Sequence, residues 1–136
     1  MVLIIGLPNA GKTTFSAKYP KVVHFDSIKG RGIERFNNVA SMVSEDNSLC
    51  VEGVYEKARE RTSLVKASKE KNTCIWLDTP VDVCVQRERE GRNRSEHIVA
   101  WAAERFEPPT FDEGWDEIII IRGENDVESY RNEKQT

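Results

Sequence analysis

The segment Gly6-Leu7-Pro8-Asn9-Ala10-Gly11-Lys12-Thr13 constrains the fold more than any other feature of the chain. It matches the pattern G-x-x-x-x-G-K-[ST], follows a short apolar run and precedes residues with helical character. The two glycines of the pattern let successive backbone N–H groups point toward an anion, and the helix adds the positive end of its dipole. The pattern therefore predicts a buried strand, a phosphate-binding loop and a helix, in that order.

Individual residues of this loop have distinct expected roles. Lys12 is expected to reach the β- and γ-phosphates of ATP, and Thr13 to offer its hydroxyl to Mg²⁺. Thr14 is placed to touch the α-phosphate. The residues predicted to bind the nucleotide are Pro8, Asn9, Ala10, Gly11, Lys12, Thr13 and Thr14.

Strand-like and helix-like segments alternate along the chain, which predicts an α/β fold in three layers, a five-stranded parallel sheet flanked by helices. The expected strands cover residues 2–5, 22–25, 48–51, 73–77 and 117–121, and the expected helices 12–18, 33–43, 54–65, 81–90 and 98–106. Trp76 and Trp101 are expected to pack rather than to stack on a base. The polar residues from Gly123 onward are expected to be frayed or to form a short helical tail.

Composition narrows the possible functions. A length of 136 residues suits one domain, residues 1–136. The net charge of −3 weighs against a dedicated binder of duplex DNA, although a local basic patch is compatible with it. No apolar run approaches the roughly 18 residues of a membrane helix. Cys50, Cys74 and Cys84 show no paired spacing, so we expect reduced thiols and a cytoplasmic protein. His24 and His97 make no zinc-ligand spacing with them.

Three of the expected strands end in an acidic residue: Asp26, Glu52 and Asp78. Ligands of open parallel sheets bind at the carboxyl ends of the strands. Asp26 is the predicted general base, because Lys29 and Arg31 follow it and would hold an anionic acceptor; the alternative is a helix cap. Glu52 is predicted to hold Mg²⁺ through water or to contact the acceptor, the alternative being a cap or ion pair. Asp78 is predicted to cap the next helix.

An arginine-rich segment over residues 87–97 interrupts the alternation and is predicted to be a short lid. Arginines from a lid stabilise the charge of a transferring phosphoryl group and exclude water. Arg89 and Arg92 lie closest to Gly91 and are predicted to be catalytic together with Lys12 and Asp26. The alternative is a solvated helix face whose arginines are neutralised by neighbouring glutamates.

Four stretches together resemble the kinase domain of 5′-hydroxyl polynucleotide kinases and related small P-loop kinases. The first two are the loop GLPNAGKTT and the strand that ends in Asp26, with Lys29 three residues later. The third is the segment after LDTP, with arginines following Val85. The fourth is FEPPTFDEGWDEI, which is similar to the family's ending FE-x-P-x-x-x-EG-[aromatic].

This resemblance implies Mg²⁺-ATP and transfer of the γ-phosphate to a hydroxyl, with Asp26 as general base and Lys29 in contact with the acceptor. The acceptor is expected to be a nucleic acid or nucleotide, including a hydroxymethylated base of phage DNA, contacted by Asp26, Lys29, Arg31 and Glu52. Where many relatives have D-x-T-N, this chain has Glu52-Gly53-Val54-Tyr55. One alternative is a small-molecule kinase, which the acidic net charge favours. Another is an ATPase or nucleotide-binding switch without an acceptor.

Overall fold

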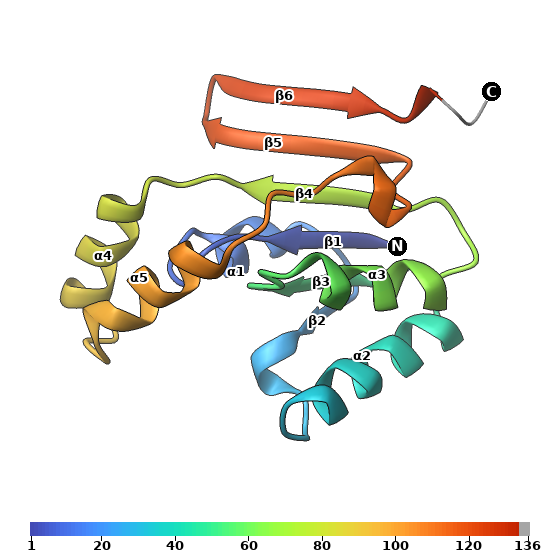
Figure 1. The fold of residues 1–136 in the computed structure, drawn as a ribbon, viewed down its shortest axis with the longest axis horizontal. Helices are drawn as coiled ribbons and strands as arrows, with labels where there is room; N and C mark the ends of the chain where they lie inside the picture. The colour runs from blue at the N-terminus through green and yellow to red at the C-terminus, as the bar shows by residue number, and fades with distance from the viewer. Residues whose placement is uncertain (134–136) are drawn as a thin grey trace.

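The computed structural model describes residues 1–133 and contains one twisted sheet (Figure 1). The strands lie in the order β2-β3-β1-β4-β5-β6, and neighbouring strands are parallel except for β5 and β6. Residues 2, 50 and 73 are in register across the centre of the sheet. The strands are β1 (Val2–Ile5), β2 (Val22–His24), β3 (Cys50–Gly53), β4 (Thr73–Leu77), β5 (Glu117–Gly123) and β6 (Asp126–Arg131).

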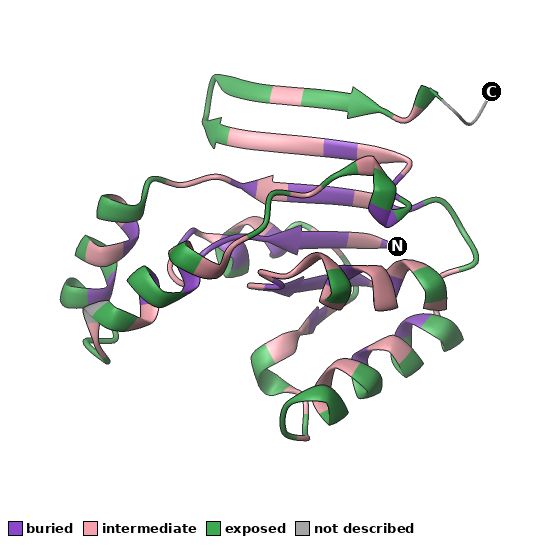
Figure 2. Ribbon diagram, in the orientation of Figure 1, coloured by how far each residue is buried: buried purple, intermediate pink, exposed green. Residues whose placement is uncertain are grey.

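The prediction of a five-stranded, purely parallel sheet is wrong in one respect, because β6 adds a sixth, antiparallel strand. A two-residue turn at 124–125 joins β5 to β6, so the segment expected to be frayed or helical pairs with β5 instead. The strand escapes detection because it lies at the edge of the sheet and is exposed over most of its length (Figure 2). An edge strand has little of the alternation between polar and buried residues that reveals a strand in a sequence.

The helices follow the predicted order with shifted boundaries. They are α1 (Lys12–Ser16), α2 (Ile33–Glu45), α3 (Ala58–Ala67), α4 (Val81–Glu90) and α5 (Glu96–Arg105), with 3₁₀ turns η1 (Phe25–Ser27) and η2 (Phe111–Glu113). The helix expected from residue 54 begins only at Ala58, because Tyr55 has a φ of +39°, outside the helical region. Asp26 lies in η1, just beyond the end of β2.

Apolar side chains pack on both faces of the sheet, which gives the three layers. On one face, α2 and α3 contribute Val39, Val43 and Leu64 to a core with Leu3 and Ile5. The other core joins β1 and β4 to α4 and α5, with side chains of α1 packed against it. Helices α4 and α5 lie beyond the carboxyl ends of the parallel strands (Figure 1). None of the helices within residues 1–133 is both long and apolar enough to cross a membrane.

A fully buried ion pair fixes the segment that follows α5. The guanidinium of Arg61 donates to both carboxylate oxygens of Glu113 (2.7 and 2.9 Å) and to the backbone carbonyl of Tyr55 (2.8 Å). Trp115 is also buried, and its indole N–H donates to Glu113 (3.0 Å). The EG-aromatic part of the stretch that resembles polynucleotide kinases therefore anchors α3 to the loop before β5, and its residues do not line the cleft described below.

Candidate active site

The loop between β1 and α1 has the backbone geometry that the motif predicts. Gly11 has a φ of +104° and Asn9 a φ of +69°. At Gly6, an added Cβ would lie 2.9 Å from the Leu77 carbonyl oxygen, so only glycine fits against β4. The hydroxyl of Thr79 donates to the carbonyl of Ala10 (2.8 Å) and ties the loop to the end of β4. These contacts hold the loop in shape before any phosphate arrives.

Lys12 folds its side chain back over this loop. Its ammonium group donates to the carbonyl oxygens of Gly6 (3.0 Å) and Leu7 (2.7 Å). Burial lowers the pKa of Lys12 to about 8, while Glu52 and Asp26 oppose that shift by attraction. The group is thus a desolvated cation bound to neutral acceptors, and a phosphate would supply the negative charge that it lacks.

A cleft of about 1140 Å³ runs along the loop at the carboxyl ends of the strands, a volume at the upper end of the range for ligand pockets. It brings together residues 8–15 of the loop and α1, the acids Asp26 and Glu52, and arginines of the lid. Its remaining walls come from β3, β4, α4, α5 and the β5–β6 turn. Besides these, it is lined by Val54, Leu77, Thr79, Pro80, Val83, Ile98, Trp101, Ala102, Ile121, Arg122, Gly123 and Glu124.

Two of the three predicted acids reach the cleft. Asp26 is exposed there, and Gly32, not Asp26, occupies the N-cap position of the next helix, α2. Glu52 is buried, and its Oε1 lies 2.8 Å from Nδ1 of His24. Asp78 does not line the cleft; it pairs with Arg122 (3.3 Å). The expectation that Asp78 caps α4 is wrong, because Pro80 occupies the N-cap position without a side-chain bond.

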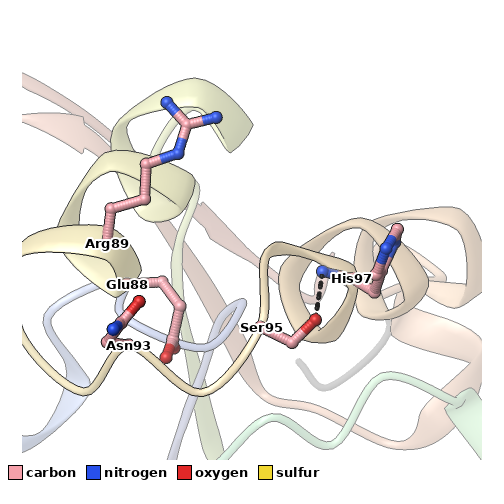
Figure 3. A pocket seen from close by; sticks show the side chains of 5 residues that line it. All are labelled: Glu88, Arg89, Asn93, Ser95 and His97. Carbon is pink, nitrogen blue, oxygen red and sulfur yellow. Dashed lines mark hydrogen bonds between the residues drawn. The ribbon is translucent and has the colours of Figure 1, made fainter.

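The lid arginines divide between the cleft and the outer surface. Arg87, Arg92 and Arg94 line the cleft, and Arg92 lies near enough to Lys12 to lower its pKa. Arg89, predicted to be catalytic, lines a separate small pocket instead, and its side chain points away from Glu88 and Asn93 (Figure 3). Helical periodicity explains the difference, because residues 87 and 89 lie on different faces of α4.

Glu88 connects the lid to the phosphate-binding loop. Its side chain is 1% exposed and accepts hydrogen bonds from the Arg94 backbone N–H (2.6 Å), the Arg94 guanidinium (2.7 Å) and the Asn9 amide (2.8 Å). The bond from Arg94 lowers the pKa of Glu88 to about 2, so the carboxylate stays ionised. Arg87 adds a second tie by donating to the Asn9 carbonyl (2.9 Å). From the sequence, Glu88 was considered only as one of the glutamates that neutralise the arginines on a solvated helix face.

The predicted acceptor contacts Lys29 and Arg31 lie outside the residues that line the cleft. Both are exposed on the loop between η1 and α2. The loop is held by its backbone carbonyls, since Asn38 donates to the carbonyl of Lys29 (3.0 Å) and Arg35 to that of Gly30 (3.3 Å). The structure therefore brings together Asp26 and Glu52 with the nucleotide loop, but not these two cations.

Several cleft residues carry no motif and were not predicted as site residues. Trp101 and Ile98 come from α5, Arg122 and Gly123 from the end of β5, and Glu124 from the turn that follows. Trp76 packs on Phe106 as expected, with ring centroids 5.4 Å apart, but Trp101 is 58% exposed. The signal for Trp101 is its spacing, because Ile98, Trp101 and Ala102 share one face of a helix that directly follows the lid.

The donor set in the cleft fits a magnesium ion bound together with a nucleotide. Magnesium is held by oxygen ligands, commonly one or two from the protein with substrate phosphates and water completing the shell. Thr13 offers an exposed hydroxyl, and Glu52 offers a carboxylate in the same cleft. One oxygen of the Glu52 carboxylate is hydrogen-bonded to His24. Carboxylates that bind metals are usually oriented by such a neighbouring group.

Comparisons with known proteins place the fold. The chain is similar to the structure of a gluconokinase from Sinorhizobium meliloti 1021 (TM-score 0.70, 9% identity, covering 90% of this chain and 82% of that one). It is also similar to a sugar kinase from Janibacter sp. HTCC2649 (TM-score 0.70, 16% identity, covering 89% and 83%). No family model matches the sequence, and no curated protein matches it. The chain thereby shares the fold of these two kinases.

Proposed function

We propose that this chain is an ATP-dependent kinase that transfers the γ-phosphate to a hydroxyl of a small, sugar-like molecule. The observation that carries the proposal is that one cleft holds the phosphate-binding loop, Asp26, Glu52 and the lid arginines Arg92 and Arg94. Phosphoryl transfer depends on positioning and on electrostatic stabilisation, and this set supplies both. Bound Mg²⁺ would neutralise phosphate charge, with Thr13 and Glu52 to hold it.

In this mechanism an acceptor hydroxyl attacks the γ-phosphorus, and Asp26 takes its proton. The bond between the γ-phosphorus and the bridging oxygen breaks, and ADP leaves. Lys12 moves from the loop carbonyls to the β- and γ-phosphates, while Arg92 faces the charge that spreads over the γ-phosphate oxygens. Arg94, which also lines the cleft, is paired with Glu88.

The small-molecule acceptor, the alternative at the level of sequence, is better supported than a nucleic acid. The structural neighbours are described as a gluconokinase and a sugar kinase. Much of the FEPPTFDEGWDEI stretch, which suggested polynucleotide kinases, has an architectural explanation in the Arg61–Glu113 pair. Lys29 and Arg31, the cations expected to hold an acceptor phosphate, do not line the cleft. The protein's pI of about 5.5 is likewise unlike that of a nucleic-acid binder.

The test is transfer of labelled γ-phosphate from ATP to a panel of sugars, sugar acids, polyols, nucleosides and 5′-hydroxyl oligonucleotides. We expect transfer to a sugar-like member, with Asp26→Asn reducing it by about 10²–10⁴-fold, the range for a lost general base. Asp112→Asn, an exposed acid on η2, is the matched control and should leave the rate unchanged. Transfer to oligonucleotides alone, or acceptor-independent ATP hydrolysis alone, would contradict the proposal.

A further inference from the structure

One of the three tryptophans has no packing role that explains its position. Trp115 is buried and bonded to Glu113, and Trp76 stacks on Phe106. Trp101 on α5 is 58% exposed, although burial of an indole contributes more hydrophobic stabilisation than that of most side chains. It lines the cleft rather than the outer surface. An exposed indole in a cleft offers an apolar surface on which a ligand can pack.

One face of the indole is contacted by a cation from the same helix. The guanidinium carbon of Arg105 lies 4.4 Å from the centroid of the Trp101 ring, within cation–π distance. Arg105 is itself fixed by an ion pair with Glu56 (2.9 Å), which belongs to the segment between β3 and α3. Because the ring already has a partner on α5 and that partner is anchored, less conformational entropy is lost when a ligand stacks against the ring.

The position of Trp101 assigns it to the acceptor side of the cleft. The Arg105–Glu56 pair links this end of α5 to the chain just after Glu52, the carboxylate at the end of β3. Val54 from the same segment and Ile98 from α5 complete an apolar wall there. In the sheet, β5 is separated from β3 by β1 and β4, so the lining residues from Ile121 to Glu124 lie away from the β3 end of the cleft. One ligand between these two ends would leave the Trp101 wall beside the γ-phosphate and Asp26.

We propose that Trp101 is a specificity-determining platform on which the acceptor stacks the flat face of a closed sugar ring. A closed ring presents a nearly planar patch of C–H groups that matches the face of an indole, whereas its hydroxyls point outward, within reach of Asp26 and Glu52. An open-chain polyol presents no such face. This inference rests on the proposed kinase function and adds to it the shape of the acceptor.

The test uses matched pairs of probes that differ only in ring closure: 1,5-anhydroglucitol with glucitol, 1,5-anhydromannitol with mannitol, and 1,4-anhydroribitol with ribitol. In the wild-type protein, we expect at least one ring member to quench tryptophan fluorescence, and to be phosphorylated with a kcat/KM about 10-fold above its open-chain partner. Trp101→Ala should raise KM for that ring about 5- to 10-fold, the range expected for an aromatic contact, with kcat nearly unchanged. Trp101→Phe should fall between, and Tyr130→Ala, an exposed aromatic on β6, should match wild type.

Three outcomes overturn the proposal outright. These are a preference for the open-chain partner in every pair, no quenching and no transfer with any ring, and a KM for the ring that Trp101→Ala leaves unchanged. A rise in KM for ATP alone would assign Trp101 to the nucleotide, and quenching by nucleosides but not by rings would assign it to a base. Quenching by a ring that Trp101→Phe abolishes, without transfer to any acceptor, would retain the platform and refute the kinase. Because Trp101 is exposed, its variants should fold as the wild type does. Their thermal unfolding midpoints should therefore equal that of the wild type.

Discussion

Two cationic side chains within residues 1–133, Arg61 and Lys12, are withdrawn from water, and their partners differ. Arg61 is 0% exposed and its charge is matched by Glu113, with backbone carbonyls taking further N–H groups. Lys12 is 9% exposed and bonds only neutral carbonyl oxygens of its own loop. The charge of Arg61 is neutralised by a carboxylate within the fold. The charge of Lys12 is desolvated without such a partner, which costs free energy until an anion binds. The comparison shows that a buried cation without a bonded carboxylate, as at Lys12, indicates an anion-binding site more strongly than a buried cation that is paired within the fold, as at Arg61.

The largest expected effect is on catalysis at the uncompensated cation. Lys12→Met should reduce phosphoryl transfer by about 10³-fold or more, the scale for a cation that stabilises the transferring group. The free energy of unfolding should stay equal to wild type or rise, because an apolar side chain of similar length replaces a desolvated ammonium. Transfer of labelled γ-phosphate from ATP measures the first effect, and urea unfolding measures the second. The exposed Lys66→Met is the control, and a clear loss of stability in Lys12→Met would erase the contrast with Arg61.

The second effect is on stability at the compensated cation. Glu113→Gln should lower the free energy of unfolding by about 3–5 kcal/mol, because it leaves the guanidinium of Arg61 buried without its counter-charge. Urea unfolding is the measurement. Replacing both partners, as Arg61→Met with Glu113→Leu, should recover much of the loss. If the double variant were no more stable than Glu113→Gln, the charge imbalance would not be the cause.

A third effect lies between these extremes, at a buried acid that accepts hydrogen bonds from both Asn9 and Arg94. Glu88→Gln should weaken the tie between Asn9 and Arg94 and lower kcat/KM by about 10- to 100-fold, as expected when catalytic groups lose their alignment. Steady-state kinetics over a range of ATP concentrations is the measurement. Glu90→Gln on the same helix, where the carboxylate only accepts a bond from Gln86, should behave as wild type. Equal kinetics in the two variants would make Glu88 an ordinary structural acid.

The smallest effect is a pH dependence that only the uncompensated cation should show. Lys12 has a pKa of about 8 when folded, against 10.5 when unfolded, so between these values the unfolded chain binds the extra proton. Stability without nucleotide should therefore gain up to about 1.4 kcal/mol per pH unit from this group as pH rises from 8 to 10.5. The difference between wild type and Lys12→Met in urea unfolding at several pH values isolates it. A difference that stays flat with pH would place the Lys12 pKa near its ordinary value.

The same contrast explains how far the sequence predicts this structure. The loop from Gly6 to Thr13 was predictable residue by residue, because its pattern encodes backbone angles and a strand–loop–helix context. The acids Asp26 and Glu52 followed from the rule that ligands bind at the ends of parallel strands. These are local features. The structure confirms the α/β fold with helices on both faces of the sheet, and it places Asp26 and Glu52 in the cleft, while their roles stay predictions.

What depends on distant contacts was not predictable. Arg61 and Glu113 are 52 positions apart, and nothing in either segment marks them as partners. Asp78 looked like a cap but pairs with Arg122, which a later strand supplies. Arg89 was predicted to be catalytic because it lies close to Gly91 in the sequence. It occupies a face of α4 that does not line the cleft, whereas Arg94, beyond the end of that helix, does line it. The strand β6 lacks the apolar alternation that marks a buried strand.

That last strand has a consequence for the protein in a crowded solution. Parallel sheets usually offer two open edges, and an open edge invites pairing with another chain. Here one edge is β2, only three residues long before it turns into η1. At the other, β6 carries Asp126, Glu128 and Arg131, and a register shift in β5 near Gly123 disturbs regular pairing. Short length on one side, and charge with irregularity on the other, protect the sheet from growing into an aggregate.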